Sequence, residues 1–235
     1  MEVNQYDIIV CGDSFCNSTE IDLKIAGRRA HFSQILEDEY GYKVLNLAHG
    51  GVSNICILFQ LREAEALKPR AIVYNRTFTG RVDLMLHDDF QVERGLKNFV
   101  YWDNCMSSYE HGGRFGKPTS SCISTVYQGL RKNSFFKLSD AQYNAVDTWL
   151  IHFHNDAKEK ELQDWMFEYW HNRLKQHGIQ PLPFRHSLVG KAAWDFCDHT
   201  PDYDTPFHTD KATQQIIAGN VHRVISQGID LPWKD

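Results

Sequence analysis

Short apolar runs alternate with helical patterns through the first third of the chain. Residues 8–11, 44–48 and 71–74 are apolar runs bounded by glycine or polar residues, which is typical of buried strands. Apolar positions at helical spacing lie between them, over about residues 30–40 and from a capping Ser53 to about residue 67. This strand-helix-strand-helix-strand order predicts an α/β fold with a parallel sheet and right-handed crossovers.

The pattern loosens from Arg81 to about Lys137, where only a short helix over residues 123–130 is predicted. Long irregular segments inside compact domains are often lids or binding insertions. A helical pattern then runs over residues 139–177, with a break near residues 155–156. Its second half carries one apolar stripe that we expect in the core, formed by Leu162, Trp165, Met166, Tyr169, Trp170 and Leu174. We therefore predict a single domain over residues 1–235 with an insertion or lid at about 82–177.

The end of the chain predicts two further elements. Pro181 and Pro183 lack an N–H group, so residues 179–184 can form only an edge strand or an extended segment. Residues 209–226 then predict an amphipathic helix, whose apolar positions are Ala212, Ile216, Ile217, Val221 and Ile225.

Composition excludes several classes of function. Hydrophobic residues make up 42% of the chain and charged residues 23%, as in ordinary globular proteins. The net charge of -5 and the lack of a long Lys/Arg run disfavour a nucleic-acid partner. No apolar stretch reaches the length of a membrane span, and the first residues do not resemble a signal peptide, so we expect a cytoplasmic protein with no membrane partner.

The six cysteines and twelve histidines do not form a metal-binding pattern. No Cys-x-x-Cys pair is present, which disfavours both a zinc ribbon and a disulfide framework. Cys11 and Cys56 lie in apolar runs and are interpreted as small buried hydrophobic residues. We expect neither a metal nor a cofactor.

Four polar blocks follow the predicted elements in order. Gly12-Asp13-Ser14 comes after the first strand, residues 46–54 come after the second, residues 75–81 come after the third, and residues 202–208 precede the last helix. In an open α/β sheet, ligands bind outside the carboxyl ends of the strands. Ser14 is therefore a candidate nucleophile. The alternative is that Gly12-Asp13-Ser14 is an ordinary turn in which Asp or Ser caps a helix.

The order of these blocks resembles that of the SGNH (GDSL-type) hydrolases. Members of that family carry a Gly-Asp-Ser nucleophile turn, a glycine after the second strand, an asparagine loop after the third strand and an Asp-x-x-His pair before the last helix. The resemblance spans residues 8–225. It implies a three-layer α/β/α flavodoxin-like fold with a parallel sheet, here with a helical insertion, and ester hydrolysis through an acyl-serine intermediate.

The resemblance also implies a catalytic triad. A serine hydroxyl needs a base within hydrogen-bond reach, and His208 is the candidate. Thr205 stands three residues before His208, where the family has its aspartate, so Asp204, four residues before, and Asp202, six before, are both candidates for the acid. If Asp204 is the acid, a bulge at Pro206 brings it within reach of His208. A further alternative is that a backbone carbonyl, and not an acid, orients the histidine.

The oxyanion of the intermediate needs donors, and the N–H groups of Ser14 and Gly51 are the main-chain candidates. Thr77 occupies the position of the family's asparagine donor, while Asn75 lies two residues earlier, so both are candidates for the third donor. Asp13 and Arg81 complete the candidate substrate-binding residues. Arg81 is expected either to bind a substrate anion or to pair with an acid on the surface.

The expected activity is removal of an O-acyl group from a small polar or carbohydrate-like ester, without a cofactor. Two alternatives remain at this point: an SGNH-like scaffold that has lost efficient hydrolysis and binds a ligand or partner, and an acyltransferase. The sequence defines neither the acyl group, the alcohol nor the oligomeric state.

Overall fold

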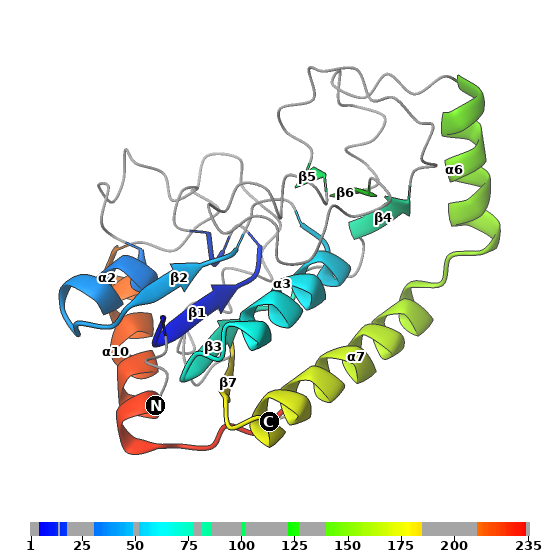
Figure 1. Ribbon diagram of the computed structural model, residues 1–235. Coiled ribbons are helices and arrows are strands. Elements are labelled where there is room, and N and C mark those ends of the chain that lie inside the picture. Colours follow the sequence, from blue (N-terminus) through cyan, green and yellow to red (C-terminus); the bar gives the residue numbers. More distant parts are fainter. Residues whose placement is uncertain are drawn as a thin grey trace. The chain divides into compact units, whose positions relative to one another are not determined.

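The computed structural model divides the chain into two compact units (Figure 1). The first comprises residues 1–50, 57–76 and 168–235, and the second comprises residues 51–56 and 77–167. The structure describes residues 5–13, 15–17, 31–48, 52–77, 81–85, 100–101, 122–126, 140–184 and 211–233.

A parallel sheet forms the centre of the first unit. Its order is β2-β1-β3-β7, which is the strand order at the start of a flavodoxin-like sheet. The predicted parallel α/β sheet is thus confirmed, including the three strands expected from the apolar runs. The strands are β1 (Ile8–Cys11), β2 (Val44–Asn46), β3 (Ala71–Tyr74) and β7 (Gln180–Pro183).

The edge position of β7 follows from its prolines. Gln180 N–H donates to Arg70 O at 3.0 Å, and Phe184 N–H donates to Tyr74 O at 2.7 Å, so the even-numbered residues face β3. The missing N–H groups of Pro181 and Pro183 therefore point away from the sheet, and no ladder hydrogen bond is lost. Among the strands that the structure describes, β7 lies at the edge of this sheet, as predicted.

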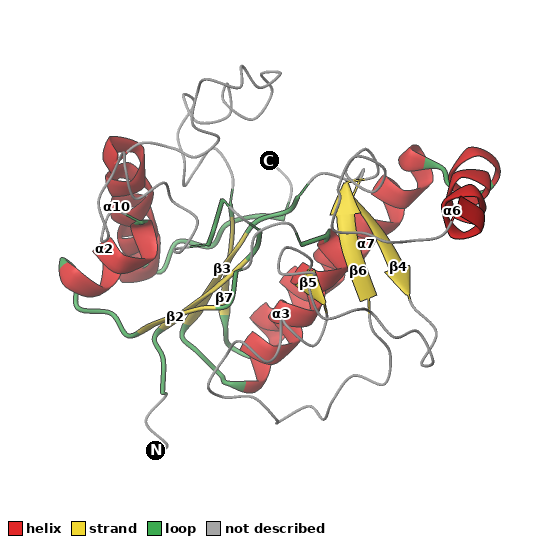
Figure 2. Cartoon of the chain, turned by 90° about the horizontal axis from the view of Figure 1, so that it is seen from above, coloured by secondary structure: helices red, strands yellow, loops and turns green. Residues whose placement is uncertain are grey.

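Helices cover both faces of this sheet. The helices α2 (Phe32–Asp38) and α10 (Lys211–Gln227) pack on one face. The parts of α3 (Asn54–Ala66) and α7 (Asp156–Gln176) that belong to this unit, residues 57–66 and 168–176, run along the other (Figures 1 and 2). The arrangement has three layers, α/β/α, as the sequence predicts. Among the residues that the structure describes, no helix is both long enough and apolar enough to cross a membrane.

The core of the first unit follows from the alternation of side chains along the strands. Ile8 and Val10 of β1 and Ala71 and Val73 of β3 belong to one buried cluster with the apolar side chains of α2 and α10. The residues between them in the sequence, such as Ile9 and Ile72, are equally buried. Burial of both faces explains why these strands are continuous apolar runs.

The predicted cap of α3 is confirmed. Ser53 is buried, and its Oγ accepts the N–H of Cys56 at 3.2 Å, which satisfies one of the free donors of the first turn. The predicted break between the two long helices is also confirmed, since α6 (Asp140–His152) ends before α7 begins at Asp156.

The second unit contains an antiparallel sheet of order β4-β6-β5 besides α6 and the first part of α7. The predicted helix over residues 123–130 is wrong at its start, because β6 (Cys122–Val126) pairs with β4 (Arg81–Met85) and with β5 (Val100–Tyr101). Three of the five residues of β6 are β-branched, and such side chains favour strands over helices.

The predicted core stripe of α7 is largely wrong. Leu162, Trp165 and Tyr169 have exposed fractions of 49%, 60% and 58%, although Leu174 is buried as expected. The buried face of the helix carries Gln163, Phe167, His171 and Leu174. Two of these four residues are polar. A prediction that counts only apolar residues therefore places the buried face of α7 on the neighbouring side of the helix.

The apolar face of α10 is predicted more closely. Ile217, Val221 and Ile225 are buried as expected, together with Ala218 and Val224. Ala212 and Ile216 are exposed, because they lie outside the stripe that faces α2 and the sheet.

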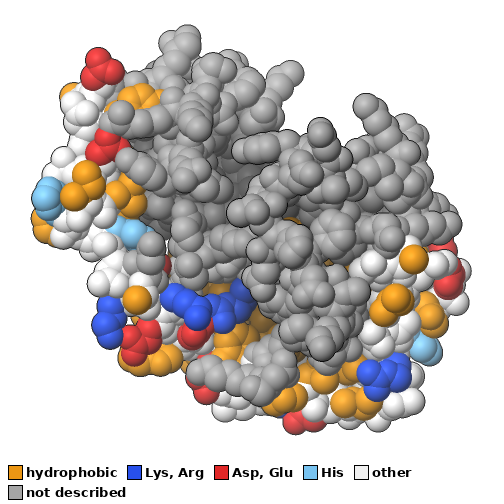
Figure 3. Space-filling view, turned by 180° about the vertical axis from the view of Figure 1, so that it is seen from behind, with side chains coloured by type: hydrophobic (Ala, Val, Ile, Leu, Met, Phe, Trp, Pro, Cys, Tyr) orange, Lys and Arg blue, Asp and Glu red, His pale blue; other side chains and the backbone are white. Residues whose placement is uncertain are grey.

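The described surface carries both signs of charge. On the face shown in Figure 3, Lys and Arg side chains lie next to Asp and Glu side chains and to hydrophobic ones. Such mixing keeps the local field small, because neighbouring charges of opposite sign cancel at a distance.

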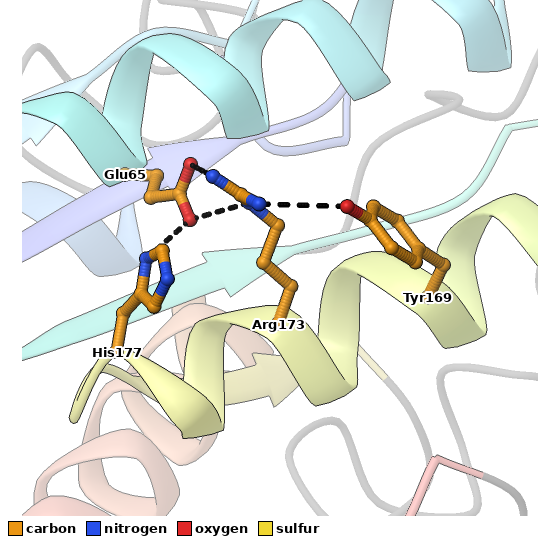
Figure 4. Close-up of polar contacts among 4 residues, drawn as sticks. All are labelled: Glu65, Tyr169, Arg173 and His177. Atoms are coloured by element: carbon orange, nitrogen blue, oxygen red, sulfur yellow. Dashed lines mark hydrogen bonds and ion pairs between the residues drawn. The ribbon is translucent and has the colours of Figure 1, made fainter.

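One ion-pair cluster joins α3 to the last part of α7 (Figure 4). Glu65, whose side chain is 11% exposed, accepts from Arg173 Nη2 at 3.0 Å, and its Oε1 lies 2.7 Å from both Arg173 Nε and His177 Nδ1. Arg173 also donates to the Tyr169 hydroxyl at 3.4 Å. The pKa of Arg173 is raised, first by its hydrogen bond to Glu65 and then by that to Tyr169. The cluster therefore favours the charged guanidinium.

Replacing Glu65 with glutamine is expected to lower the midpoint of thermal unfolding by about 2 °C at low salt, because the two partners lose their shared negative charge. The shift should shrink in 1 M NaCl, which screens charges. Glu161→Gln is the matched control, since the Lys158–Glu161 pair is exposed. An equal effect of both substitutions would contradict a specific role of the Glu65 cluster.

Candidate functional site

The carboxyl ends of β1 and β3 form the point at which the direction of strand addition reverses. The chain passes from β1 to β2 on one side of β1 and then returns to β3 on the other. Asn75 N–H donates to Cys11 O at 3.3 Å, so the residues that follow the two strands are neighbours. In doubly wound sheets this switch point is where ligands bind.

Asp13 and Asn75 form a reciprocal pair at this switch point. Asn75 Oδ1 accepts the N–H of Asp13 at 3.0 Å, and Asn75 Nδ2 donates to Asp13 Oδ1 at 2.7 Å. Both residues are buried. The asparagine carboxamide thus satisfies the main chain and the side chain of one residue, which fixes the direction in which the chain leaves β1.

A second reciprocal pair joins Gly12 to Gln60 of α3. Gly12 N–H donates to Gln60 Oε1 at 2.6 Å, and Gln60 Nε2 donates to Gly12 O at 3.3 Å. The Gln60 side chain is buried, so both of its polar atoms would be costly to leave unpaired.

Gly12 adopts a conformation that other residues rarely adopt. Its φ is +152°, and a Cβ at this position would lie 1.9 Å from Asn75 Oδ1 and 2.9 Å from Cys16 Cβ. A side chain would therefore occupy the space that the Asn75 carboxamide fills. Glycine is required here for both backbone conformation and close approach.

The turn that begins at Asp13 is held by hydrogen bonds within itself and by a third side chain, that of Asn46. Cys16 N–H donates to Asp13 O at 3.0 Å, and Phe15 N–H donates to Asp13 Oδ1 at 3.1 Å. Asn46, the last residue of β2, donates through Nδ2 to Cys16 O at 2.8 Å and accepts the N–H of Ala48 at 3.0 Å. Asn46, Gln60 and Asn75 are named the amide clamp.

The amide clamp and Asp13 together accept the main-chain N–H groups of the turn that a ligand would otherwise contact. The N–H groups of Gly12, Asp13, Phe15 and Cys16 all have acceptors within the protein. These four groups are therefore not donors to an oxyanion. The turn is held as a shaped loop whose polar groups, in its described part, are turned inward.

The structure brings together two of the residues that the sequence marks as candidates, Asp13 and Asn75. Thr77 belongs to the second unit, where its N–H donates to Asn54 Oδ1 at 2.8 Å and its carbonyl accepts from Asn54 Nδ2 at 3.1 Å. Arg81 begins β4, and its side chain lies outside the described part of the chain. The other candidates lie outside the described residues, namely Ser14, Gly51, Asp204 and His208.

Asn54 is held in turn by the same kind of side chain. Its Nδ2 also donates to Gln163 Oε1 at 2.6 Å, and Gln163 Nε2 donates to Glu159 Oε1 at 3.0 Å. The segment that follows Asn75 is thus anchored to the start of α3 within the second unit.

Sequence reasoning missed Gln60 and gave Asn46 no role. The signal for Gln60 was present, because it lies in the same helical stripe as the buried Ile57, Leu61 and Ala64. A polar residue in such a stripe needs a buried partner. The signal for Asn46 was its place at the carboxyl end of a strand, next to the Gly-Gly block.

Two thiols lie beside the clamped turn. Burial raises the pKa of the Cys11 thiol well above its ordinary value, with a further increase from Glu63. Burial also raises the pKa of Cys16, with further increases from the charge of Asp13 and from Cys11. Both thiols are therefore neutral at physiological pH, and the structure confirms that Cys11 and Cys56 are buried.

Cys11 and Cys16 are expected to resist iodoacetamide in the native protein at pH 8 and to react completely in 6 M guanidinium, because only the accessible thiolate reacts. Mass spectrometry of the N-terminal peptide measures both states. The pKa of each thiol is higher in the folded protein than in the unfolded chain, where it is about 8.5. The free energy that the two buried neutral thiols contribute to folding is therefore fully present below about pH 8.5 and falls as the pH rises above it. Modification of either thiol in the native protein would contradict this.

Within the described ranges, no group of three His, Cys, Asp or Glu side chains could hold a metal ion. The chemistry of the clamped turn is that of amides, a carboxylate and neutral thiols, which is a set suited to hydrogen bonding.

Comparison with known proteins adds no family assignment. The chain matches no model of a known protein family, and no curated protein matches its sequence.

Proposed function

We propose that this protein is a serine-dependent ester hydrolase of the SGNH type, acting on small-molecule esters in the cytoplasm. The observation that carries the proposal is the fixed Gly12-Asp13 turn at the carboxyl ends of β1 and β3. It directly precedes Ser14 in the sequence and is held by reciprocal amide pairs with Gln60 and Asn75. A nucleophile needs such support, because small errors in its position cost large factors in rate.

In the proposed reaction, Ser14 Oγ attacks the ester carbonyl while its proton passes to His208. Asp204 orients that histidine and stabilises its charged form. The tetrahedral intermediate then collapses: the bond to the alcohol breaks, and His208 returns the proton to the leaving oxygen. Water, activated by the same histidine, releases the acid and restores Ser14.

The oxyanion is assigned to the N–H groups of Ser14 and Gly51 and to the Thr77 hydroxyl. Asn75 was the other candidate for the third donor. Its Nδ2 donates to Asp13 Oδ1 at 2.7 Å and to Arg76 O at 3.4 Å, so both of its N–H groups already have acceptors. We therefore propose Asn75 as an orienting residue and Thr77 as the side-chain donor. The substrate class expected from the sequence, a small polar or carbohydrate-like O-acyl ester, is retained.

Hydrolysis of p-nitrophenyl acetate tests this proposal. The wild-type protein is expected to turn over the ester, and Ser14→Ala and His208→Ala are each expected to lower kcat by about 10³-fold or more. Ser226→Ala and His152→Ala, at exposed positions on α10 and α6, are the matched controls and should retain activity. Activity that survives Ser14→Ala would exclude Ser14 as the nucleophile. An inactive wild type would favour the ligand-binding alternative.

A further inference from the structure

We infer that Gln60 is a positioning residue of the proposed active site, one that fixes the main chain leading into Ser14. This inference rests on the proposed function. Gln60 lies on α3, more than forty residues after Ser14 in the sequence, and its side chain reaches the main chain of Gly12 from the helix layer.

The contact is suited to orienting Gly12 because it uses both main-chain polar groups of that residue, which belong to the peptide groups before and after its Cα. Gly12 N–H donates to Gln60 Oε1 at 2.6 Å, and Gly12 O accepts from Gln60 Nε2 at 3.3 Å. With a single hydrogen bond, Gly12 could still rotate about the bonded atom. Two hydrogen bonds to the same carboxamide fix its orientation relative to Gln60. Gly12 has a φ of +152°, where a glycine without such contacts has several alternatives.

Burial makes this orientation hard to exchange for another. Gln60 is 2% exposed, so water does not readily replace either bond. The next residue, Asp13, is then held by Asn75, and Cys16 by Asn46. Gln60 therefore fixes Gly12, and the rest of the amide clamp fixes the residues that follow.

A positioning role predicts a particular kinetic change. Gln60 does not contact the reacting atoms in the proposal, so its loss should leave ester binding unchanged while the acylation step slows. We expect Gln60→Met, which keeps the length but removes both hydrogen bonds, to lower kcat by about 10²-fold with little change in KM.

The test measures the rate of phosphonylation by a fluorophosphonate probe and the hydrolysis of p-nitrophenyl acetate. Gln60→Glu keeps an acceptor for Gly12 N–H but loses the donor to Gly12 O, so its rates should lie between those of wild type and Gln60→Met. The matched control is Gln180→Met. Gln180 Nε2 also donates to main-chain carbonyls, those of Val224 and Ile229. Because Gln180 begins β7, it lies at the amino ends of the parallel strands, away from the proposed site.

Hydrogen exchange of the peptide containing residues 8–17 provides a readout independent of catalysis. Faster exchange there in Gln60→Met, with thermal unfolding close to that of Gln180→Met, supports the inference. Should Gln60→Met not fold, Gln60→Glu supplies the comparison.

Three outcomes are distinguishable. Slower phosphonylation in the Gln60 variants than in Gln180→Met supports the inference. A wild-type protein that reacts and a Gln60→Met variant that reacts equally fast would overturn the role of Gln60 alone. A wild-type protein inert toward both reagents would overturn the proposed function, and this inference with it.

Discussion

Replacing Gly12 with alanine is expected to destabilise the protein by about 4 kcal/mol and to abolish the proposed esterase activity. The new Cβ would lie 1.9 Å from Asn75 Oδ1, so the carboxamide must move, and the buried N–H and carboxylate of Asp13 lose their hydrogen bonds to Asn75. The φ of +152° adds backbone strain. Urea unfolding followed by circular dichroism measures the loss, and p-nitrophenyl acetate hydrolysis measures the activity.

Gly219→Ala is the matched control for this substitution. Gly219 lies in α10, and the nearest atom to an added Cβ is the Tyr40 hydroxyl at 3.5 Å, which is an ordinary contact. Alanine inside a helix should raise stability by about 0.5 to 1 kcal/mol. If Gly12→Ala were as stable as wild type, the close approach of Asn75 to the turn would be wrong.

Replacing Asn75 with leucine is the second substitution with a large expected effect, a loss of about 3 kcal/mol. Leucine has a similar size but cannot accept from Asp13 N–H or donate to Asp13 Oδ1, so a buried carboxylate loses a donor at 2.7 Å. Asn172→Leu, at an exposed position of α7, is the control and should change the free energy of unfolding by less than about 0.5 kcal/mol.

A double-mutant cycle isolates the contact itself. Asp13→Ala and Asn75→Leu should be coupled by about 1.5 to 3 kcal/mol, because both remove the bond from Asn75 Nδ2 to Asp13 Oδ1. Asn75→Leu also removes the acceptor of the residue-13 main-chain N–H, a bond that Asp13→Ala keeps. Additive losses would mean that the side-chain bond between the two residues does not stabilise the turn. Such a result would contradict the reciprocal pair.

Much of the fold could be predicted because burial on both faces of the sheet leaves a simple signal. Ile8–Cys11 and Ala71–Tyr74 are uninterrupted apolar runs, and the structure has strands at these bounds. The alternating prolines of β7 likewise predict its edge position, because only one side of that strand needs N–H groups.

Prediction failed where burial involves polar side chains or distant pairing. The buried face of α7 includes Gln163 and His171, so a count of apolar residues selected the face of Leu162 and Trp165 instead. Residues 122–126 form a strand because β4, about forty residues earlier in the chain, pairs with them. Local spacing carries no information about that partner.

In the candidate site, too, the local sequence order predicted some residues, and contacts between distant segments determined the others. The order of polar blocks after the strands predicted that Asp13 and Asn75 belong to one site, and both lie at the switch point. The contribution of Gln60 depends on which face of α3 packs against β1, and this is a property of the three-dimensional structure. For that reason the amide clamp could not be assembled from motif order alone.

The most direct test of Ser14 as the nucleophile is to identify the residue that a fluorophosphonate modifies. Intact-mass analysis of the treated wild-type protein should show one phosphonyl adduct, and peptide mapping should place it on Ser14. Ser14→Ala should remain unmodified under the same conditions, whereas Ser226→Ala should react like the wild type. No adduct on the wild-type protein, or an adduct that persists in Ser14→Ala, would contradict a nucleophilic role of Ser14.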